Sequence, residues 1–289
     1  MTIVTLDTID EDQILATFND AFADYFVPLV LDRMRFERML RRRGYRGDLS
    51  VGAVRDGKLV GVSLTGFGSW NRTTTGYGSG TGVVPEARNE GLAGRMILRA
   101  AALAAEAGAS RYVLEVIQQN EPARRAYERS GFRVARELLC WTLDAAPPAG
   151  TPAVTLDALP GFDPPPGLGS WTPSWQNSNE SLARASEPLL TFIASERSHV
   201  VGFAVLSPES GDLPQFAVHP DRRRTGIGRA LVAAARAASA HPLRIINTDA
   251  RATETTAFLR ALGAQPAFSQ FEMVLANAAC GRAVAARTP

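Results

Sequence analysis

The spacing of apolar residues changes several times along the first half of the chain, and each change predicts a helix or a strand. Residues 2–6 read as a strand, and Ile14, Phe18 and Phe22 then recur at helical spacing behind an acidic first turn. The pattern continues with a helix over 32–42, strands over 49–54, 59–65 and 80–84, a helix over 94–106, a strand over 112–117, a helix over 123–129 and strands over 132–143.

The chain contains an internal repeat. Residues 83–93 align without a gap on residues 218–228, at an offset of 135, with Val, Pro, Arg and Gly at matching places. Upstream, the strand-like run at 59–64 resembles the run at 200–205. The repeat predicts two domains built on one plan.

The repeat and the Pro-rich segments set the expected domain boundaries. We expect an N-terminal domain over 1–143, a linker over 144–152, a C-terminal domain over 153–276 and a frayed tail over 277–289. In the C-terminal domain, 154–156 is strand-like and 180–185 helical. From Leu213 onward the order strand, loop, helix, strand, helix, strand repeats that of the first half.

Composition and charge narrow the class of protein. Hydrophobic residues make up 45% and charged residues 21%, which excludes a disordered chain. A formal net charge of +2 does not favour nucleic-acid binding. The two cysteines, Cys140 and Cys280, have no spacing typical of a zinc site, so we expect no metal. Without a signal peptide or a long apolar run, we expect a cytoplasmic protein with no membrane partner.

The repeated segment carries candidate chemistry. A strand that runs through a Gly-bearing loop into a helix start presents unpaired N–H groups at the positive end of a helix dipole, which favours an anion. The loops, 88–94 and 223–228, lack the Lys-Ser/Thr of a nucleoside-triphosphate site, so the expected ligand is a pyrophosphate without metal. The alternative is a helix-start turn with surface arginines. Two copies in matching contexts favour the ligand.

At this point the sequence resembles the GNAT superfamily of N-acetyltransferases, whose pyrophosphate motif runs Arg/Gln-x-x-Gly-x-Gly/Ala between the fourth strand and the third helix. Both halves fit this motif. In the first half the resemblance extends over 114–132, with Asn120, Tyr127 and the Gly131–Phe132 pair at the family's places. It implies two tandem α/β domains, each a mixed, mostly antiparallel sheet flanked by helices.

The resemblance also implies acetyl-CoA as cosubstrate and names the residues that would hold it. In the family, Asn at the place of Asn120 contacts the CoA arm. The implied acetyl-CoA contacts are Val83, Val84, Arg88, Asn89, Glu90, Gly91, Leu92, Ala93, Gly94 and Asn120 in the first half, and Ala217, Val218, Arg223, Arg224, Thr225, Gly226, Ile227 and Gly228 in the second.

Amide formation from a thioester needs a neutral amine, a polarised carbonyl and a proton for the leaving sulfur. Splaying of the fourth and fifth strands would free N–H groups near Val83 and Val84 for the pantetheine and the thioester oxygen. Tyr127 is the expected acid, unless it is a packing residue. Asn120 has an equal alternative, a helix N-cap. All three histidines lie in the second half, so the candidate base in the first half is Glu115 acting through a water. The alternative is that Glu115 is an exposed strand glutamate with no catalytic role.

The second half departs from the motif. Leu259 stands at the place of Tyr127 and Ala252 at the place of Asn120. We therefore expect this half to bind CoA without catalysing transfer, or to be vestigial.

Aromatic and basic residues outside these motifs have weaker interpretations. Tyr25, Phe26 and Trp70 are candidates for an amine-binding rim or for packing. The arginine run 41–43 is expected to be a solvated helix end, and the run 222–224 is a candidate for the 3′-phosphate of CoA.

The function expected is therefore an acetyl-CoA-dependent N-acetyltransferase that acts on a small amine by direct transfer in a ternary complex. The alternative is a non-catalytic CoA-binding sensor or scaffold. The sequence leaves open the acceptor, the acyl chain length and whether the protein is a monomer or a homodimer.

Overall fold

The computed structural model describes residues 1–26, 29–148, 152–162, 164–165, 167–169 and 171–276. The chain forms two compact units. The first unit consists of residues 1–136 together with the residues from 271 on, and the second unit of residues 137–270. The expected tail, 277–289, lies outside the described residues.

This division differs from the expected one at both ends. The strands β6 (Arg133–Leu143) and β12 (Gln265–Ala276) each contribute residues to both units. Met273 and Leu275, from the end of the chain, are buried in the core of the first unit beside its helix residues. A boundary drawn at residue 143 in sequence order misses this contribution, because residues 271–276 of β12, the last strand of the described residues, belong to the first unit.

The first unit is a mixed α/β domain, as expected from the sequence. Its sheet has the order β1-β2-β3-β4-β5, in which only the β4–β5 pair is parallel. The elements in chain order are β1 (Thr2–Thr5), α1 (Glu11–Phe22), α2 (Arg33–Arg43), β2 (Val51–Arg55), β3 (Lys58–Trp70), β4 (Thr73–Val83), α3 (Leu92–Glu106), β5 (Arg111–Ile117) and α4 (Glu121–Arg129).

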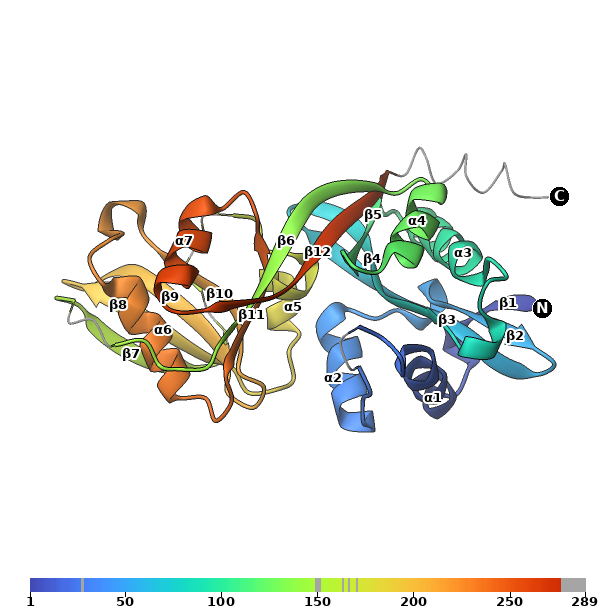
Figure 1. Ribbon diagram of the computed structural model, residues 1–289, viewed down its shortest axis with the longest axis horizontal. Coiled ribbons are helices and arrows are strands. Elements are labelled where there is room, and N and C mark those ends of the chain that lie inside the picture. The colour runs from blue at the N-terminus through green and yellow to red at the C-terminus, as the bar shows by residue number, and fades with distance from the viewer. Residues whose placement is uncertain (27–28, 149–151, 163, 166, 170, 277–289) are drawn as a thin grey trace. The chain divides into compact units, whose positions relative to one another are not determined.

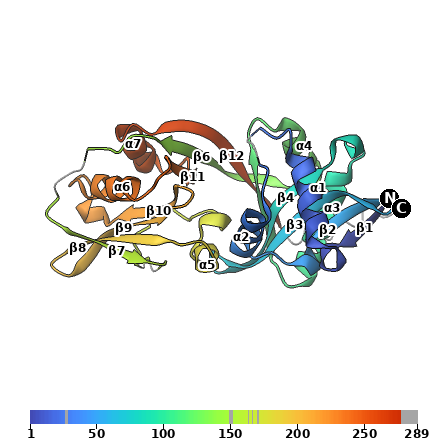
Figure 2. The same cartoon turned by 90° about the horizontal axis from the view of Figure 1, so that it is seen from below.

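Helices cover both faces of this sheet, with α1 and α2 on one side and α3 and α4 on the other (Figures 1 and 2). Glycines on β4 allow the close approach. A Cβ placed on Gly82 would lie 2.8 Å from the ring of Phe22 in α1, and one on Gly76 would lie 2.8 Å from Ala104 in α3. The period of Ile14, Phe18 and Phe22 predicted the buried face of α1 correctly.

The second unit has the strand order β6-β11-β10-β9-β8-β7, with β10 and β11 parallel. One core includes Leu231 and Leu259 of the helices α6 and α7, and another includes Leu182 of α5 with Phe203 and Val205. The elements are β7 (Thr155–Pro160), α5 (Asn179–Ala183), β8 (Leu190–Glu196), β9 (His199–Ser207), β10 (Asp212–Val218), α6 (Ile227–Ala237), β11 (Leu243–Asp249) and α7 (Thr253–Ala261).

The internal repeat is confirmed in three dimensions. The series β4, loop, α3, β5, α4 in the first unit corresponds to β10, loop, α6, β11, α7 in the second. None of the helices in the described part of the chain is both long and apolar enough to span a membrane.

Candidate active site

The strands β4 and β5 of the first unit pair over only part of their length. Their parallel register runs from Thr75–Arg111 to Gly78–Leu114, and both strands continue beyond it. A β-bulge interrupts β4 at the same level, where its register with β3 shifts between Leu64 and Thr65. Ser79 and Glu115 are therefore the first residues of an opening between the two strands, which we call the wedge.

The amide groups that face the wedge follow from the alternation of an antiparallel pair. Val84 donates its N–H to the carbonyl of Val60 on β3, at 3.0 Å. Since successive N–H groups point to opposite edges of a strand, those of Val83 and Thr81 point to the wedge. The expectation for Val83 fits this geometry. The amide of Val84 is already bonded within the sheet and is not free for a ligand, so any other contact between Val84 and acetyl-CoA stays a prediction.

The same alternation holds in the second unit. The N–H of His219 donates to the carbonyl of Val201 at 2.8 Å. The amide of Val218 therefore faces β11, as expected. The amide of Ala217 faces β9, so a contact between Ala217 and the cosubstrate would not use this N–H and stays a prediction.

The loop before α3 is built as an anion cradle. Asn89 and Gly91 both have positive φ, 66° and 72°, and no side chain caps the helix at its N-cap, Gly91. The helices α1, α2 and α4, by contrast, are capped by Asp10, Asp32 and Asn120. The first amides of α3, those of residues 92–94, lack partners within the helix and lie at the positive end of its dipole.

The space beside this cradle is open. A Cβ added to Gly91 would meet no atom within 4 Å. The side chain of Glu90, expected at the cosubstrate, is drawn into an ion pair with Arg55 instead. The loop before α6 repeats the geometry, with positive φ at Arg224 and Gly226 and no side-chain cap.

The arginine of the motif, Arg88 in the first unit and Arg223 in the second, bonds the loop to the strand that precedes it. Arg88 donates through Nε to the carbonyl of Val83 at 3.1 Å, and through its two Nη atoms to the carboxylate of Asp24 at 2.6 and 2.7 Å. In the second unit, Arg223 bonds the carbonyl of Val218 at 3.3 Å and Glu254 at 2.6 Å. Both guanidinium groups thus tie the loop to the preceding strand, and a contact of either arginine with the pyrophosphate stays a prediction.

Tyr127, on α4, lies at the α3 and α4 face of the wedge. Its side chain is buried, its ring centroid lies 5.8 Å from that of Phe132, and its hydroxyl bonds the side chain of Thr81 on β4. Burial raises the pKa of Tyr127 above its ordinary value. The phenol is therefore protonated at neutral pH and can act as a proton donor.

Asn120 is the N-cap of α4. Its Oδ1 accepts the N–H of Ala123 at 3.2 Å, so the capping alternative is confirmed. The side chain also bonds the hydroxyl of Tyr25. A contact between Asn120 and CoA stays a prediction.

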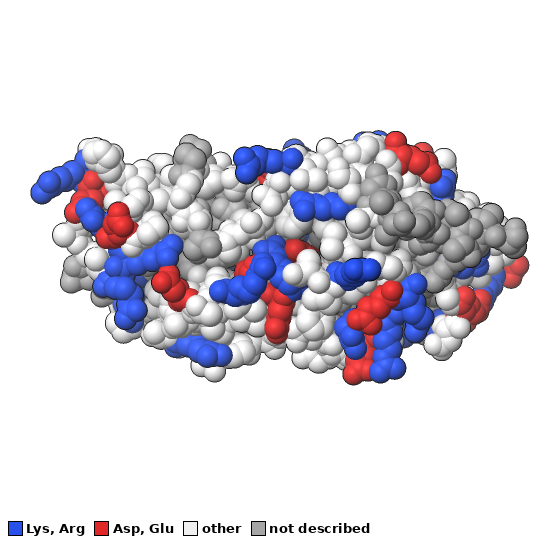
Figure 3. Space-filling model, turned by 90° about the horizontal axis from the view of Figure 1, so that it is seen from above, with Lys and Arg blue, Asp and Glu red and all other residues white. Residues whose placement is uncertain are grey.

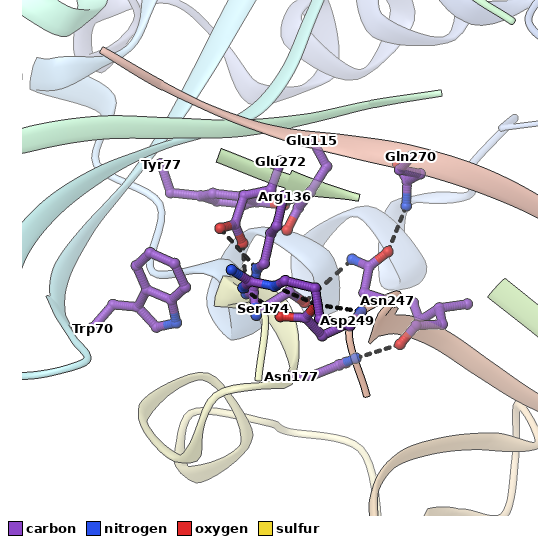
Figure 4. Close-up of polar contacts among 12 residues, drawn as sticks. Trp70, Tyr77, Glu115, Arg136, Ser174, Asn177, Asn247, Asp249, Gln270 and Glu272 are labelled. Carbon is purple, nitrogen blue, oxygen red and sulfur yellow. Dashed lines mark hydrogen bonds and ion pairs between the residues drawn. The ribbon is translucent and has the colours of Figure 1, made fainter. Parts of the chain in front are cut away.

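Glu115, on β5, lies on the opposite face of the sheet from Tyr127. Leu114 and Val116 belong to the core under α3, and alternation turns Glu115 to the face of α1 and α2. The hydroxyl of the buried Tyr77 on β4 donates to its Oε2 (Figure 4). The alternative of an exposed strand glutamate is therefore wrong.

Burial raises the pKa of Glu115 to about 7, against the opposing effect of the Tyr77 hydrogen bond. The charge of Glu272 raises it further, whereas Arg43 and Arg136 lower it. Arg136 and Glu272 form a buried ion pair, with nitrogen–oxygen distances of 3.0 and 2.7 Å (Figure 4). A carboxylate with a pKa near 7 is suited to accept a proton at neutral pH.

Tyr77 and Arg43 were missed from the sequence. The arginine run 41–43 was expected to be solvated, yet Arg43 donates to the carbonyl of Ser79 at the bulge, at 2.7 Å. Trp70 is buried, with the guanidinium of Arg111 4.6 Å from its ring centroid. Of the two alternatives for Trp70, packing in the core therefore fits better than a place at the rim of an amine-binding site. Phe26 is 59% exposed, in keeping with a rim position.

The second unit lacks both candidate reactive groups. Leu259 takes the place of Tyr127 and is fully buried. Asn247 takes the place of Glu115, and its amide bonds Gln270 at 2.7 Å and Ser174 at 3.2 Å (Figure 4).

Aromatic rings also occupy the side of the second unit's wedge where Tyr127 and Thr81 lie in the first. Phe216 replaces Thr81, and its ring lies 6.0 Å from that of Phe258 and 5.8 Å from that of Trp171. A Cβ on Gly228, in the first turn of α6, would lie 3.1 Å from the ring of Phe258.

Metal ligands and charge do not add a further site. No group of three or more His, Cys, Asp or Glu residues among those described could hold a metal ion. His219 accepts the N–H of Asp221 through Nδ1 at 3.3 Å. Arg222, a candidate for the 3′-phosphate, pairs with Glu196 at 2.6 Å. On the face drawn in Figure 3, basic and acidic side chains lie beside one another.

Known proteins resemble the chain over both units. The model of the acetyltransferase (GNAT) family matches residues 14–132, and that of an acetyltransferase (GNAT) domain matches residues 187–263. Streptothricin acetyltransferase from Streptomyces lavendulae is 40% identical over 85 residues, which are 29% of this chain and 42% of that protein. The chain therefore spans less than half the length of this relative.

Two solved structures share the fold over nearly the whole chain. A tandem GNAT protein from the clavulanic acid biosynthesis pathway is 17% identical, covers 96% of this chain and 98% of its own, and has a TM-score of 0.71. An N-acetyltransferase from Sphaerobacter thermophilus is also 17% identical, with a coverage of 95% and 96% and a TM-score of 0.69. With family matches in both halves, the chain belongs to the GNAT family of N-acyltransferases and carries two GNAT domains in tandem.

Proposed function

We propose that the first unit transfers an acetyl group from acetyl-CoA to the amine of a small molecule by direct attack in a ternary complex. The observation that carries the proposal is the placement of Glu115 and Tyr127 on opposite faces of one wedge. A thioester threaded through the wedge would meet the amine on the face of α1 and α2. Its sulfur would leave on the face of α3 and α4.

The cradle before α3 fits the pyrophosphate of CoA. Uncapped amides at a helix start and two positive-φ residues form a concave array of donors, and the open space beside Gly91 admits phosphate oxygens. The N–H groups of Thr81 and Val83, on the wedge edge of β4, are candidates for the pantetheine and the thioester oxygen. Acetyl-CoA, when bound, supplies the activated acyl group.

The protein's residues then move two protons. Glu115 takes a proton from the amine, directly or through a water, so that the nitrogen lone pair forms the new bond to the carbonyl carbon. The carbon–sulfur bond breaks, and Tyr127 donates its proton to the departing thiolate. The threonine partner, Thr81, can stabilise the phenolate that this step leaves, because its hydroxyl bonds the Tyr127 oxygen.

The acceptor is proposed to be a small amine. A relative that matches part of the chain is named as a streptothricin acetyltransferase. The exposed ring of Phe26 lies in the segment after α1, where it could contact such an acceptor. The second unit, with Asn247 and Leu259 at the reactive positions, is proposed to be non-catalytic.

The test measures thiol release from acetyl-CoA against a panel of amines. Glu115→Gln is expected to lower kcat/KM by about 10²- to 10⁴-fold, the effect of losing a positioned base. Glu106→Gln, which removes an exposed carboxylate paired with Arg99, is the matched control and should leave the rate unchanged. Full activity in Glu115→Gln would contradict the proposal.

A further inference from the structure

Glu115 is held by a partner that the motifs of the family do not include. Tyr77 lies on β4 opposite Val113, within the segment where β4 and β5 are still paired. Its side chain is 2% exposed, and its hydroxyl donates to Oε2 of Glu115. Tyr77 thus lies in the paired part of β4, and Glu115 is the first residue of β5 beyond the paired part.

This hydrogen bond fixes the orientation of the carboxylate. With Oε2 bonded to Tyr77, Oε1 is the oxygen that remains to accept a proton from an amine or a water. The bond also favours the ionised form of Glu115, because a donor stabilises the charge. The other charged groups that face Glu115 are Glu272, which favours the protonated form, and Arg43 and Arg136, which favour the ionised form.

Tyr77 is not suited to exchange protons itself. Burial and the neighbouring charge of Glu115 raise its pKa well above the ordinary value, so the phenol keeps its proton throughout the working range of pH. It therefore acts on Glu115 as a fixed donor. The acid proposed for the sulfur, Tyr127, lies on the other face of the sheet.

We propose that Tyr77 is a positioning residue that holds Glu115 in its ionised, correctly oriented form through the hydrogen bond from its hydroxyl to Oε2. This inference rests on the proposed function, in which Glu115 is the base. The contact can be tested by one substitution, because replacing Tyr77 by Phe removes the hydroxyl that donates to Glu115 and preserves the ring.

The experiment is the pH dependence of kcat/KM for Tyr77→Phe. Loss of a hydrogen bond to a charged group should move the acid limb upward by about one pH unit or more. At one pH unit below the wild-type midpoint, the rate should then fall a further tenfold or so, and at pH 9.5 it should stay within a few-fold of wild type. Tyr45→Phe, which removes a half-buried phenol bonded to the neutral Ser50, is the control and should leave the limb in place.

Each outcome has one meaning. An unmoved limb in folded Tyr77→Phe would overturn the inference while leaving Glu115 as the base. A limb that persists in Glu115→Gln would instead overturn the proposed function. If Tyr77→Phe does not fold, a fluorinated tyrosine at position 77, which is a stronger donor, should move the limb downward, and an unmoved or raised limb would refute the inference.

Discussion

Replacing Tyr127 by Phe tests whether its phenol is the acid that protonates the leaving thiolate. The ring of Tyr127 packs on Phe132, and its hydroxyl bonds Thr81. The substitution preserves the packing and removes the proton donor and one hydrogen bond. Turnover and stability should therefore respond to very different extents.

The expected magnitudes separate the two roles. A neutral hydrogen bond contributes about 1 kcal/mol to the free energy of unfolding, so the midpoint of denaturation should fall only slightly. Loss of a positioned acid lowers turnover by about 10²- to 10⁴-fold, equivalent to about 3–5 kcal/mol of activation free energy. A CoA thiol is a tolerable leaving group at neutral pH, which favours the lower end of that range.

Tyr112→Phe is the matched control, measured in the same assays. Tyr112 also packs on Phe132, with ring centroids 6.3 Å apart, and its hydroxyl bonds Thr65 at 2.8 Å. It lies in the paired part of β5, opposite Gly76, and so away from the wedge. The control variant should lose about the same stability as Tyr127→Phe and keep its turnover.

The assays are thiol release for kcat, calorimetric titration for acetyl-CoA affinity and urea denaturation for stability. Affinity should stay within a few-fold in both variants. If Tyr127→Phe turns over at the rate of Tyr112→Phe, Tyr127 is a packing residue and the acid must be sought elsewhere. If affinity and turnover fall together, the hydroxyl contacts the cosubstrate in its ground state instead.

Three further predictions concern the loops, the base and the buried ion pair. The rings of Phe258 and Phe216 lie 6.0 Å apart beside the first turn of α6, so we expect them to hinder acetyl-CoA there and titration to give about one site per chain. Gly91→Glu should abolish this site, while Gly226→Glu and the equally strained Gly57→Glu (φ 75° and open, as at Gly91) should not. Two sites would show that the rings do not prevent binding. The pKa of Glu115 is raised from 4.5 to about 7, so the unfolded chain releases this proton first and stability falls between those pH values. Glu115→Gln should remove that loss and be more stable than wild type by about 3 kcal/mol at pH 8 but by little at pH 4, measured by urea denaturation. An equal gain at both pH values would contradict the assigned cause. Glu272→Gln removes the charge that pairs with the buried Arg136 and should cost about 3–5 kcal/mol of stability. Glu121→Gln, in an exposed pair with Arg125, should cost under about 0.5 kcal/mol, and similar losses in the two variants would refute the distinction.

The elements that could be predicted from the sequence are those with one clear period or a strong turn signal. Helix α1 and the hairpin at Asp56–Gly57 are of this kind, and so is the pyrophosphate loop, whose glycine must take a positive φ. The strands β3 and β4 were expected over 59–65 and 80–84 but extend over Lys58–Trp70 and Thr73–Val83. Their added length is rich in Gly, Ser and Thr, which give no apolar alternation.

The candidate site was predictable only where its residues lie in a local motif. Tyr127 and Gly91 stand at fixed spacings from their neighbours in sequence, whereas Tyr77 reaches Glu115 across 38 residues and Arg136 reaches Glu272 across 136. The bulge that places Ser79 near Arg43 also shifts the side-chain alternation of β4 by one residue. Such contacts depend on strand register, which the sequence pattern does not determine over a Gly-rich strand.

The two halves together show which parts of the motif bear on function. In both, the arginine ties the loop to the preceding strand and the glycine takes a positive φ, so these residues have a structural role whether or not a ligand binds. The informative differences lie at the wedge. Where the first unit has Glu115, Tyr127 and the small Ala126, the second has Asn247, Leu259 and Phe258 in the same order along β5–α4 and β11–α7. Each replacement removes the proposed base, the proposed acid or a small side chain. We therefore propose that the glycine-bearing loop marks the GNAT fold, whereas the residues at the wedge decide whether a domain can transfer an acyl group.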